Sequence, residues 1–238
     1  MVGKDTKREI SIEELLGNIG KRLGKTPDVA IARELAALWS HGINRVSNDE
    51  LRMAVKYYYL KNVPVEFYSA PSSVSGNYHP WWHNQTAGMM RHLTECCVMA
   101  DRFLRCYGFV QGDSEAVDPK ARDIVLAATV ITDTWKNGMP WGDRTVKNHG
   151  EIAANAWIHI AKTLGFPDED LVRQIAEAVH WHYGRYTPVA FGEEKRRLLE
   201  LPPLVQIVHL LDSCSANRDI PILYRPVERI APPENIKL

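Results

Sequence analysis

The sequence has no excess of charge of either sign. Lysine plus arginine and aspartate plus glutamate number 29 each, so the formal net charge at pH 7 is 0. A neutral chain does not recruit nucleic acid or an acidic membrane surface through its overall field, although a local basic groove is compatible with this balance. Among phosphate-bearing partners, a small nucleotide is therefore favoured over a long polymer.

Long apolar runs are also missing. No uninterrupted run approaches the roughly 20 residues that a helix needs to span a bilayer. The first ten residues, MVGKDTKREI, are charged and contain no apolar stretch typical of a signal peptide. We therefore expect a cytoplasmic protein with no membrane partner.

Cysteine is scarce, and the cysteines form no C-x-x-C pair. Three of them fall in one predicted helix, where neighbouring side chains point in different directions. A disulfide framework or a zinc knuckle is therefore not expected, and buried free thiols are the simpler interpretation. The four residues are Cys96, Cys97, Cys106 and Cys214.

Helical periodicity is abundant. The apolar fraction of 45% is that of an ordinary globular protein, and 238 residues suffice to bury a core. Three N-terminal segments, 11–24, 27–43 and 47–63, have apolar residues at helical spacing, and Ser11 with Glu14 forms a capping-box pattern. Residues 1–65 are therefore predicted to form an N-terminal helical segment.

The stretch 64–85, PVEFYSAPSSVSGNYHPWWHNQ, has no helical period and is rich in proline, serine and glycine. Because it also carries many aromatic residues and histidines, we predict an ordered loop that lies over the following segment. No alternating strand pattern and no internal repeat is found, so the predicted fold class is all-α. Five further helices are expected, at 86–107, 118–135, 149–165, 168–183 and 202–217.

Each of these five helices places one ligand-type residue on its apolar side. A buried polar group must be paired or bound to something, and a single inward histidine is most often a hydrogen-bonded core residue. Five on five different helices are harder to explain that way. At 180–182 we expect His182, rather than His180, to face the interior. The five inward residues are His92, Asp133, His149, His182 and Asp212.

Mixed imidazole and carboxylate ligands suit a first-row divalent ion such as Mn, Fe, Co, Ni or Zn better than calcium. Asp133 also ends a predicted helix, where the helix dipole disfavours negative charge, so a metal ion or Lys136 should compensate it. The sequence therefore predicts a divalent metal site between the helices.

The order of these residues resembles the HD-domain superfamily of metal-dependent phosphohydrolases. The similar segments are AGMMRHLTECC with His92, TDTWK with Asp133, KNHGEIAANA with His149, HWHYG with His182 and VHLLDSCSAN with Asp212. The preceding APSSVSGNYHP is similar to a lead-in of HD proteins common in phages and prokaryotes. The resemblance covers roughly residues 66–220, and residues 221–238 would form a tail packed on that domain.

The resemblance implies a helical bundle around one or two divalent ions, magnesium included among the candidates. Water activated by the metal would attack the phosphorus of a nucleotide or short nucleic acid. His92, Asp133 and Asp212 would hold the main ion, and His149 with His182 a second one. Asp133 and Lys136 would be the catalytic pair. The implied substrate contacts are Lys136, Arg185, His79, His83 and Trp82, with weaker candidates in Arg91 and Arg144.

One position departs from the family pattern. The superfamily has a histidine directly before the aspartate, where this chain has Thr132. A neutral threonine hydroxyl does not replace an imidazole as a metal ligand. The sequence leaves three readings open: a hydrolase with a weakened metal site, a catalytically degenerate domain that binds a nucleotide or phosphate, and a protein-interaction module. Retention of the other ligands and Lys136 favours the hydrolase.

Overall fold

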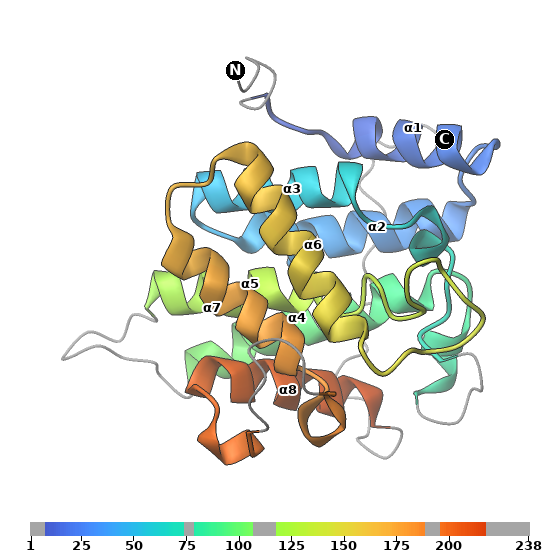
Figure 1. Ribbon diagram of the computed structural model, residues 1–238. Coiled ribbons are helices and arrows are strands. Elements are labelled where there is room, and N and C mark those ends of the chain that lie inside the picture. Colours follow the sequence, from blue (N-terminus) through green and yellow to red (C-terminus); the bar gives the residue numbers. More distant parts are fainter. Residues whose placement is uncertain (1–7, 74–78, 107–117, 189–195, 218–238) are drawn as a thin grey trace.

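The computed structural model describes residues 8–73, 79–106, 118–188 and 196–217, and within these ranges every regular element is a helix (Figure 1). The predicted all-α fold class is confirmed. The α-helices in these ranges are α1 (Ile12–Leu23), α2 (Val29–His41), α3 (Asp49–Lys61), α4 (Gly88–Cys106), α5 (Pro119–Ile131), α6 (His149–Leu164), α7 (Glu169–Trp181) and α8 (Pro203–Ala216).

Local sequence signals account for where several helices begin and end. The Ser11 side chain accepts a hydrogen bond from the backbone N–H of Glu14 at 3.2 Å and caps α1 as predicted. Asp168 caps α7 in the same way, through the N–H of Leu171 at 2.8 Å. Gly165 ends α6 with a φ of 64°, a left-handed conformation that favours glycine.

α5 and α8 contact each other, and both also contact α4 and α7; in Figure 1, α4 and α5 lie in the middle and α8 lies below them. α6 packs against α7, and α2 packs against α4, which ties the N-terminal helices to the rest. Buried side chains from Ile10 to Leu211 belong to a single hydrophobic core. The boundary at residue 65 stays a prediction, and the predicted tail at 221–238 lies outside the described residues. Among the described helices, none is long and apolar enough to cross a membrane.

α5 is shorter than predicted. It ends at Ile131, and the chain continues in tight turns in which the N–H groups of Thr134, Lys136 and Gly138 each bond to the carbonyl three residues earlier. Such turns hold fewer residues per turn than an α-helix, so the 3.6-residue period does not extend to residue 135. As a result Asp133 lies on a turn just beyond the helix.

The described part of the 64–85 loop lies against the start of α4, as predicted. The backbone N–H of Met89 bonds to the carbonyl of Ala70 at 3.1 Å, and Ser72 N–H bonds to the carbonyl of His83 at 2.8 Å. Two short 3₁₀-helices contact α4 from this loop, namely η3 (Val65–Tyr68) and η4 (Trp81–Asn84).

The expectation that His180 lies on the outer side of its helix was wrong. His180 and His182 are both buried, each with 1% of its surface exposed. α7 contacts α5, α6 and α8, so more than one of its sides is covered by neighbouring helices. A single apolar stripe therefore underestimates how much of α7 is buried.

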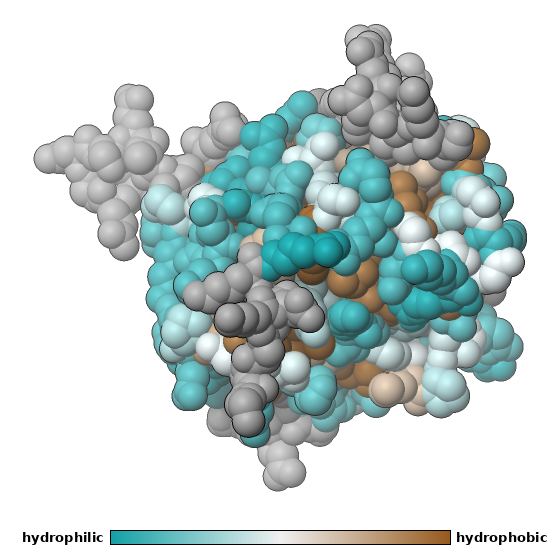
Figure 2. Space-filling view, turned by 90° about the horizontal axis from the view of Figure 1, so that it is seen from above, coloured by the Kyte–Doolittle hydropathy of each residue, from teal (hydrophilic) through white to brown (hydrophobic). Residues whose placement is uncertain are grey.

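Seen from above, the face that carries α1 is mainly hydrophilic, with apolar side chains exposed in strips between the polar ones (Figure 2). A surface hollow on the α1 and α3 side is lined by residues that include Ile10, Met53, Tyr57 and Phe166. The hollow shares none of its lining residues with the histidine and aspartate cluster described next.

Candidate metal centre

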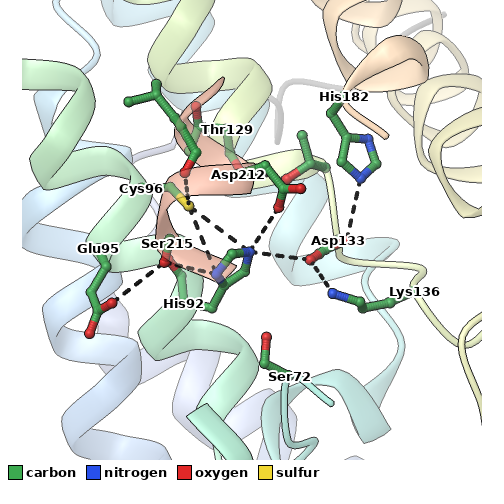
Figure 3. A network of polar contacts seen from close by, with 12 residues as sticks. Ser72, His92, Glu95, Cys96, Thr129, Asp133, Lys136, His182, Asp212 and Ser215 are labelled. Carbon is green, nitrogen blue, oxygen red and sulfur yellow. Dashed lines mark hydrogen bonds and ion pairs between the residues drawn. The ribbon is translucent and has the colours of Figure 1, made fainter. Parts of the chain in front are cut away.

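Asp133 lies at the middle of a buried polar cluster. Its Oδ2 atom is 3.5 Å from Nε2 of His92 and 2.8 Å from Nζ of Lys136. Its Oδ1 atom is 3.4 Å from Nε2 of His149 and 3.4 Å from Nε2 of His182. Figure 3 shows His92 directed at Asp133, with Lys136 and His182 on the far side of that carboxylate. The turn after α5 thus brings one carboxylate between three histidines, which lie on α4, at the start of α6 and directly after α7.

On one side of Asp133 lie the imidazoles of His149 and His182. Nδ1 of His149 donates to the carbonyl of Val146 at 2.6 Å, and Nδ1 of His182 donates to the carbonyl of Val179 at 2.6 Å. Because the ring hydrogen is used on Nδ1, a neutral ring has its lone pair on Nε2, the nitrogen near Asp133. Burial would lower the pKa of His182, but the nearby Asp133 carboxylate raises it overall. Metal-bound histidines are commonly oriented by such hydrogen bonds to backbone carbonyls.

On the other side lies His92 of α4, whose Nε2 atom is 2.9 Å from Oδ1 of Asp212 of α8. The Nδ1 atom of His92 contacts the hydroxyl of Ser215 at 2.9 Å. Asp212 is the more accessible member, with 20% of its side chain exposed. This set of two carboxylates and one imidazole therefore contains one partly exposed ligand-type residue.

A third group contains His79 and His83 of the loop together with His92. The ring centroids lie 4.9 Å (His79 to His92), 5.4 Å (His83 to His92) and 5.7 Å (His79 to His83) apart. Burial lowers the pKa of His79 and of His83, so both rings are neutral at pH 7. Neutral imidazole is the form that binds metal ions.

Three donor sets result, and the ligand atoms in each set lie within 4.8 Å of one another. His92 belongs to two sets and Asp133 to two, so the sets form a continuous row. The buried Oδ1 atom of Asp133 accepts no hydrogen bond from the described residues. A buried carboxylate oxygen without a hydrogen bond, 3.4 Å from two imidazole nitrogens, fits a bound cation. These buried histidines and aspartates can hold a metal ion. The sets are His79–His83–His92, His92–Asp133–Asp212 and Asp133–His149–His182.

Asp133 and Lys136 form a buried ion pair. Burial by itself would raise the pKa of Asp133, but the Lys136 ammonium outweighs burial, aided by three nearby imidazoles, and holds that pKa well below its usual value. Burial would lower the pKa of Lys136, yet the carboxylates of Asp133 and Asp212 raise it overall. The carboxylate is therefore ionised and the amine protonated at neutral pH.

Three other residues predicted at or beside the site make their contacts outside the three donor sets. The indole N–H of Trp82 donates to Oε1 of Glu95 at 3.0 Å, whereas Arg185 is exposed and its guanidinium stacks on the ring of Tyr186. Thr132 is buried, and its hydroxyl donates to the carbonyl of Thr129 at 3.0 Å. The proposed substrate contacts of Trp82 and Arg185 stay predictions.

Sequence reasoning missed Glu95, a buried carboxylate that connects the loop with the ligands. It accepts hydrogen bonds from Nε2 of His83 at 2.8 Å and from Trp82, and the Ser215 hydroxyl donates to it at 3.4 Å. Through Ser215 the carboxylate also reaches His92, as Figure 3 shows. Glu95 therefore orients two imidazoles of the row.

The helical spacing of the sequence could have identified these supporting residues. Glu95 follows His92 by three residues on α4, and Ser215 follows Asp212 by three residues on α8. Residues three apart share a helix face, so each lies beside a ligand. Tyr183 was also missed, although it directly follows His182; its ring centroid lies 5.1 Å from that of His149.

Comparison with known proteins returned no relative: no family model, no curated protein sequence and no solved structure matches the chain.

Proposed function

We propose that this protein is an HD-type, metal-dependent phosphohydrolase that cleaves a phosphoester of a nucleotide or a short nucleic acid. The observation that carries the proposal is the position of Asp133, whose two oxygens face two different donor sets while Lys136 lies 2.8 Å away. A carboxylate shared by two sets is the arrangement expected of a two-ion centre for phosphoryl chemistry.

In this proposal two groups of residues would bind two different metal ions. His92, Asp133 and Asp212 would hold one divalent ion, and Asp133 with His149 and His182 would hold a second. Such ions supply Lewis acidity, which lowers the pKa of water and offsets negative charge on phosphoryl oxygens. The donor chemistry favours Mn, Fe, Co, Ni or Zn, since the second set is dominated by imidazole.

Lys136 is the proposed phosphate contact. Its ammonium is protonated and nearly buried, with 9% exposure, so its charge is weakly screened. An incoming phosphoryl oxygen would share the ammonium with Asp133, whose Oδ2 atom lies 2.8 Å from Nζ of Lys136. Lys136 therefore positions the substrate at the carboxylate that both ions use.

A second candidate function is binding without catalysis. The hydroxyl of Thr132 is used on the carbonyl of Thr129, and this supports a centre that lacks one imidazole ligand. A site weakened in this way would still offer Lys136 to a phosphate. The protein would then act as a nucleotide or phosphate sensor.

The test is a hydrolysis assay with added Mn²⁺, read by mass spectrometry. The panel contains nucleoside mono- and triphosphates, cyclic dinucleotides, and short RNA and DNA. Turnover by the unmodified protein that disappears in Asp133→Ala supports the phosphohydrolase and names its substrate class. Nucleotide binding without turnover supports the sensor, and neither binding nor turnover contradicts both.

A further inference from the structure

The histidine set nearest the loop differs chemically from the other two. His79, His83 and His92 contribute three imidazoles and no carboxylate, and Asp133 is not among them. His79 has 6% of its surface exposed, and His83 and His92 have none. A cluster of three buried, closely spaced imidazoles needs a physical explanation, because the metal sites of the proposed hydrolase use only His92 of the three.

The hydrogen bonding of His83 defines which of its nitrogens is available. Nε2 donates to the carboxylate of Glu95 at 2.8 Å, so in the neutral ring the lone pair is on Nδ1. This Nδ1 atom is buried and has no hydrogen-bond partner among the described residues. A carboxylate that holds one ring nitrogen while the other stays bare is a recurrent arrangement behind metal-bound histidine.

His79 repeats the pattern from the other end of the same short segment. Its Nδ1 atom is also buried and without a hydrogen-bond partner in the described part of the chain. His92 completes the set from α4. Its Nδ1 contacts Ser215 and its Nε2 contacts Asp212, each at 2.9 Å, so an ion at this set would replace one of these two contacts. One nitrogen from each of the three rings lies within 4.8 Å of the other two.

We propose that His79, His83 and His92 form an additional metal-binding position that fastens segment 79–85 to α4. Three imidazole nitrogen ligands select Zn²⁺, Co²⁺, Ni²⁺ or Cu²⁺ and disfavour Mg²⁺ and Ca²⁺, which prefer oxygen ligands. An ion there cross-links two parts of the chain that otherwise meet through a few hydrogen bonds. The proposal does not depend on hydrolysis, because an ion at this position needs neither Asp133 nor Lys136.

The His79–His83–His92 set competes with the His92–Asp133–Asp212 set for His92. Nε2 of His92 is 2.9 Å from Asp212, and one imidazole nitrogen binds one ion at a time. An ion held by the three histidines therefore withdraws His92 from the ion between Asp133 and Asp212. Weakening the carboxylate set should strengthen the histidine set.

The experiment is a Co²⁺ titration followed by visible absorption, in which bound Co²⁺ is counted against protein. The background variant is Asp133→Asn with Lys136→Met, which removes the ligand shared by the other two sets and keeps the charge balanced. We expect this variant to bind one Co²⁺, and His83→Phe added to it to abolish that binding. An excess of Mg²⁺ should not displace the ion. A background variant that binds no Co²⁺, or binding unaffected by His83→Phe, would overturn the proposal.

A second measurement covers the case in which the background variant does not fold. In the otherwise unmodified protein, His83→Phe should bind one Co²⁺ fewer than the parent and lose part of the rise in melting temperature that Zn²⁺ produces. The control is His159→Phe, an exposed histidine of α6. Equal Co²⁺ counts in the His83 variant and its control would contradict the histidine position. Loss of turnover in Asp133→Ala, by contrast, reports only on the hydrolase.

Discussion

The Nε2 atoms of His149 and His182 lie 2.9 Å apart, although each ring donates its Nδ1 hydrogen to a backbone carbonyl. Two neutral rings in these tautomers would bring two lone pairs against each other, so the contact requires a proton or a cation between them. The Oδ1 atom of Asp133 has no hydrogen bond from the described residues and lies 3.4 Å from both nitrogens, so it adds a third atom that can donate an electron pair to a cation. A single cation would satisfy all three atoms.

The first prediction separates the donor sets by metal content. His182→Ala should lose the ion held with His149 but keep the ion near His92, whereas Asp133→Ala should weaken both. We expect affinity losses beyond the roughly 10- to 100-fold that loss of a supporting residue causes. Equilibrium dialysis against Mn²⁺ or Zn²⁺ with elemental analysis measures this, and His159→Ala is the control. Unchanged metal content in Asp133→Ala would refute the ligand assignment.

The second prediction concerns Glu95, which holds His83 directly and His92 through Ser215. Glu95→Gln removes the negative charge. It also replaces one carboxylate oxygen, which accepts hydrogen bonds, with an amide N–H₂ group that can only donate them. Metal affinity should fall about 10- to 100-fold, because the imidazoles lose their fixed orientation. Isothermal titration calorimetry measures the change. Glu66→Gln, an exposed carboxylate in the same loop, should bind metal like the parent, and equal affinity of both variants would contradict the role of Glu95.

The third prediction concerns the support of the turn that carries Asp133. The buried hydroxyl of Tyr58 on α3 lies 2.7 Å from the hydroxyl of Thr134. Tyr58→Phe should lower the free energy of unfolding by about 0.5–1.5 kcal/mol, the usual contribution of one such hydrogen bond. Urea unfolding followed by circular dichroism measures it. The control is Tyr57→Phe, at a half-buried neighbouring position. If it lowers the free energy of unfolding by as much as Tyr58→Phe, the Tyr58–Thr134 hydrogen bond does not explain the loss of stability.

The fourth prediction tests Lys136 as a substrate contact. In Lys136→Met the ammonium no longer competes for Asp133, so metal affinity should stay the same or rise. Turnover should fall by roughly 100- to 1,000-fold, the loss typical of removing one group that stabilises transition-state charge. Metal content and initial rates are measured on the same preparation. A parallel loss of metal and activity would show that Lys136 supports the centre and does not act on the substrate.

Helical periodicity predicted most of the fold and the inward positions of three histidines and two aspartates, because a residue on the apolar stripe of a packed helix points to the core. It failed beyond Ile131, where tighter turns replace the helix, and at His180, since α7 is covered on several sides. It also gave no means of bringing His79 and His83 to His92. The path of an irregular loop depends on tertiary contacts such as the His83–Glu95 hydrogen bond, which no period encodes.

The last prediction concerns Thr132→His, which would supply the imidazole that the HD pattern has at this position. Thr132 directly precedes Asp133 and has 2% of its surface exposed, so the larger ring should cost about 1–3 kcal/mol of stability without metal. With metal, an added nitrogen ligand should tighten binding at least tenfold, measured by competition with a chelator, and raise any turnover. Thr132→Leu brings similar bulk without a ligand and should show only the loss of stability. If the two variants bind metal equally, residue 132 does not face the ions, and the centre must function with the ligands it already has.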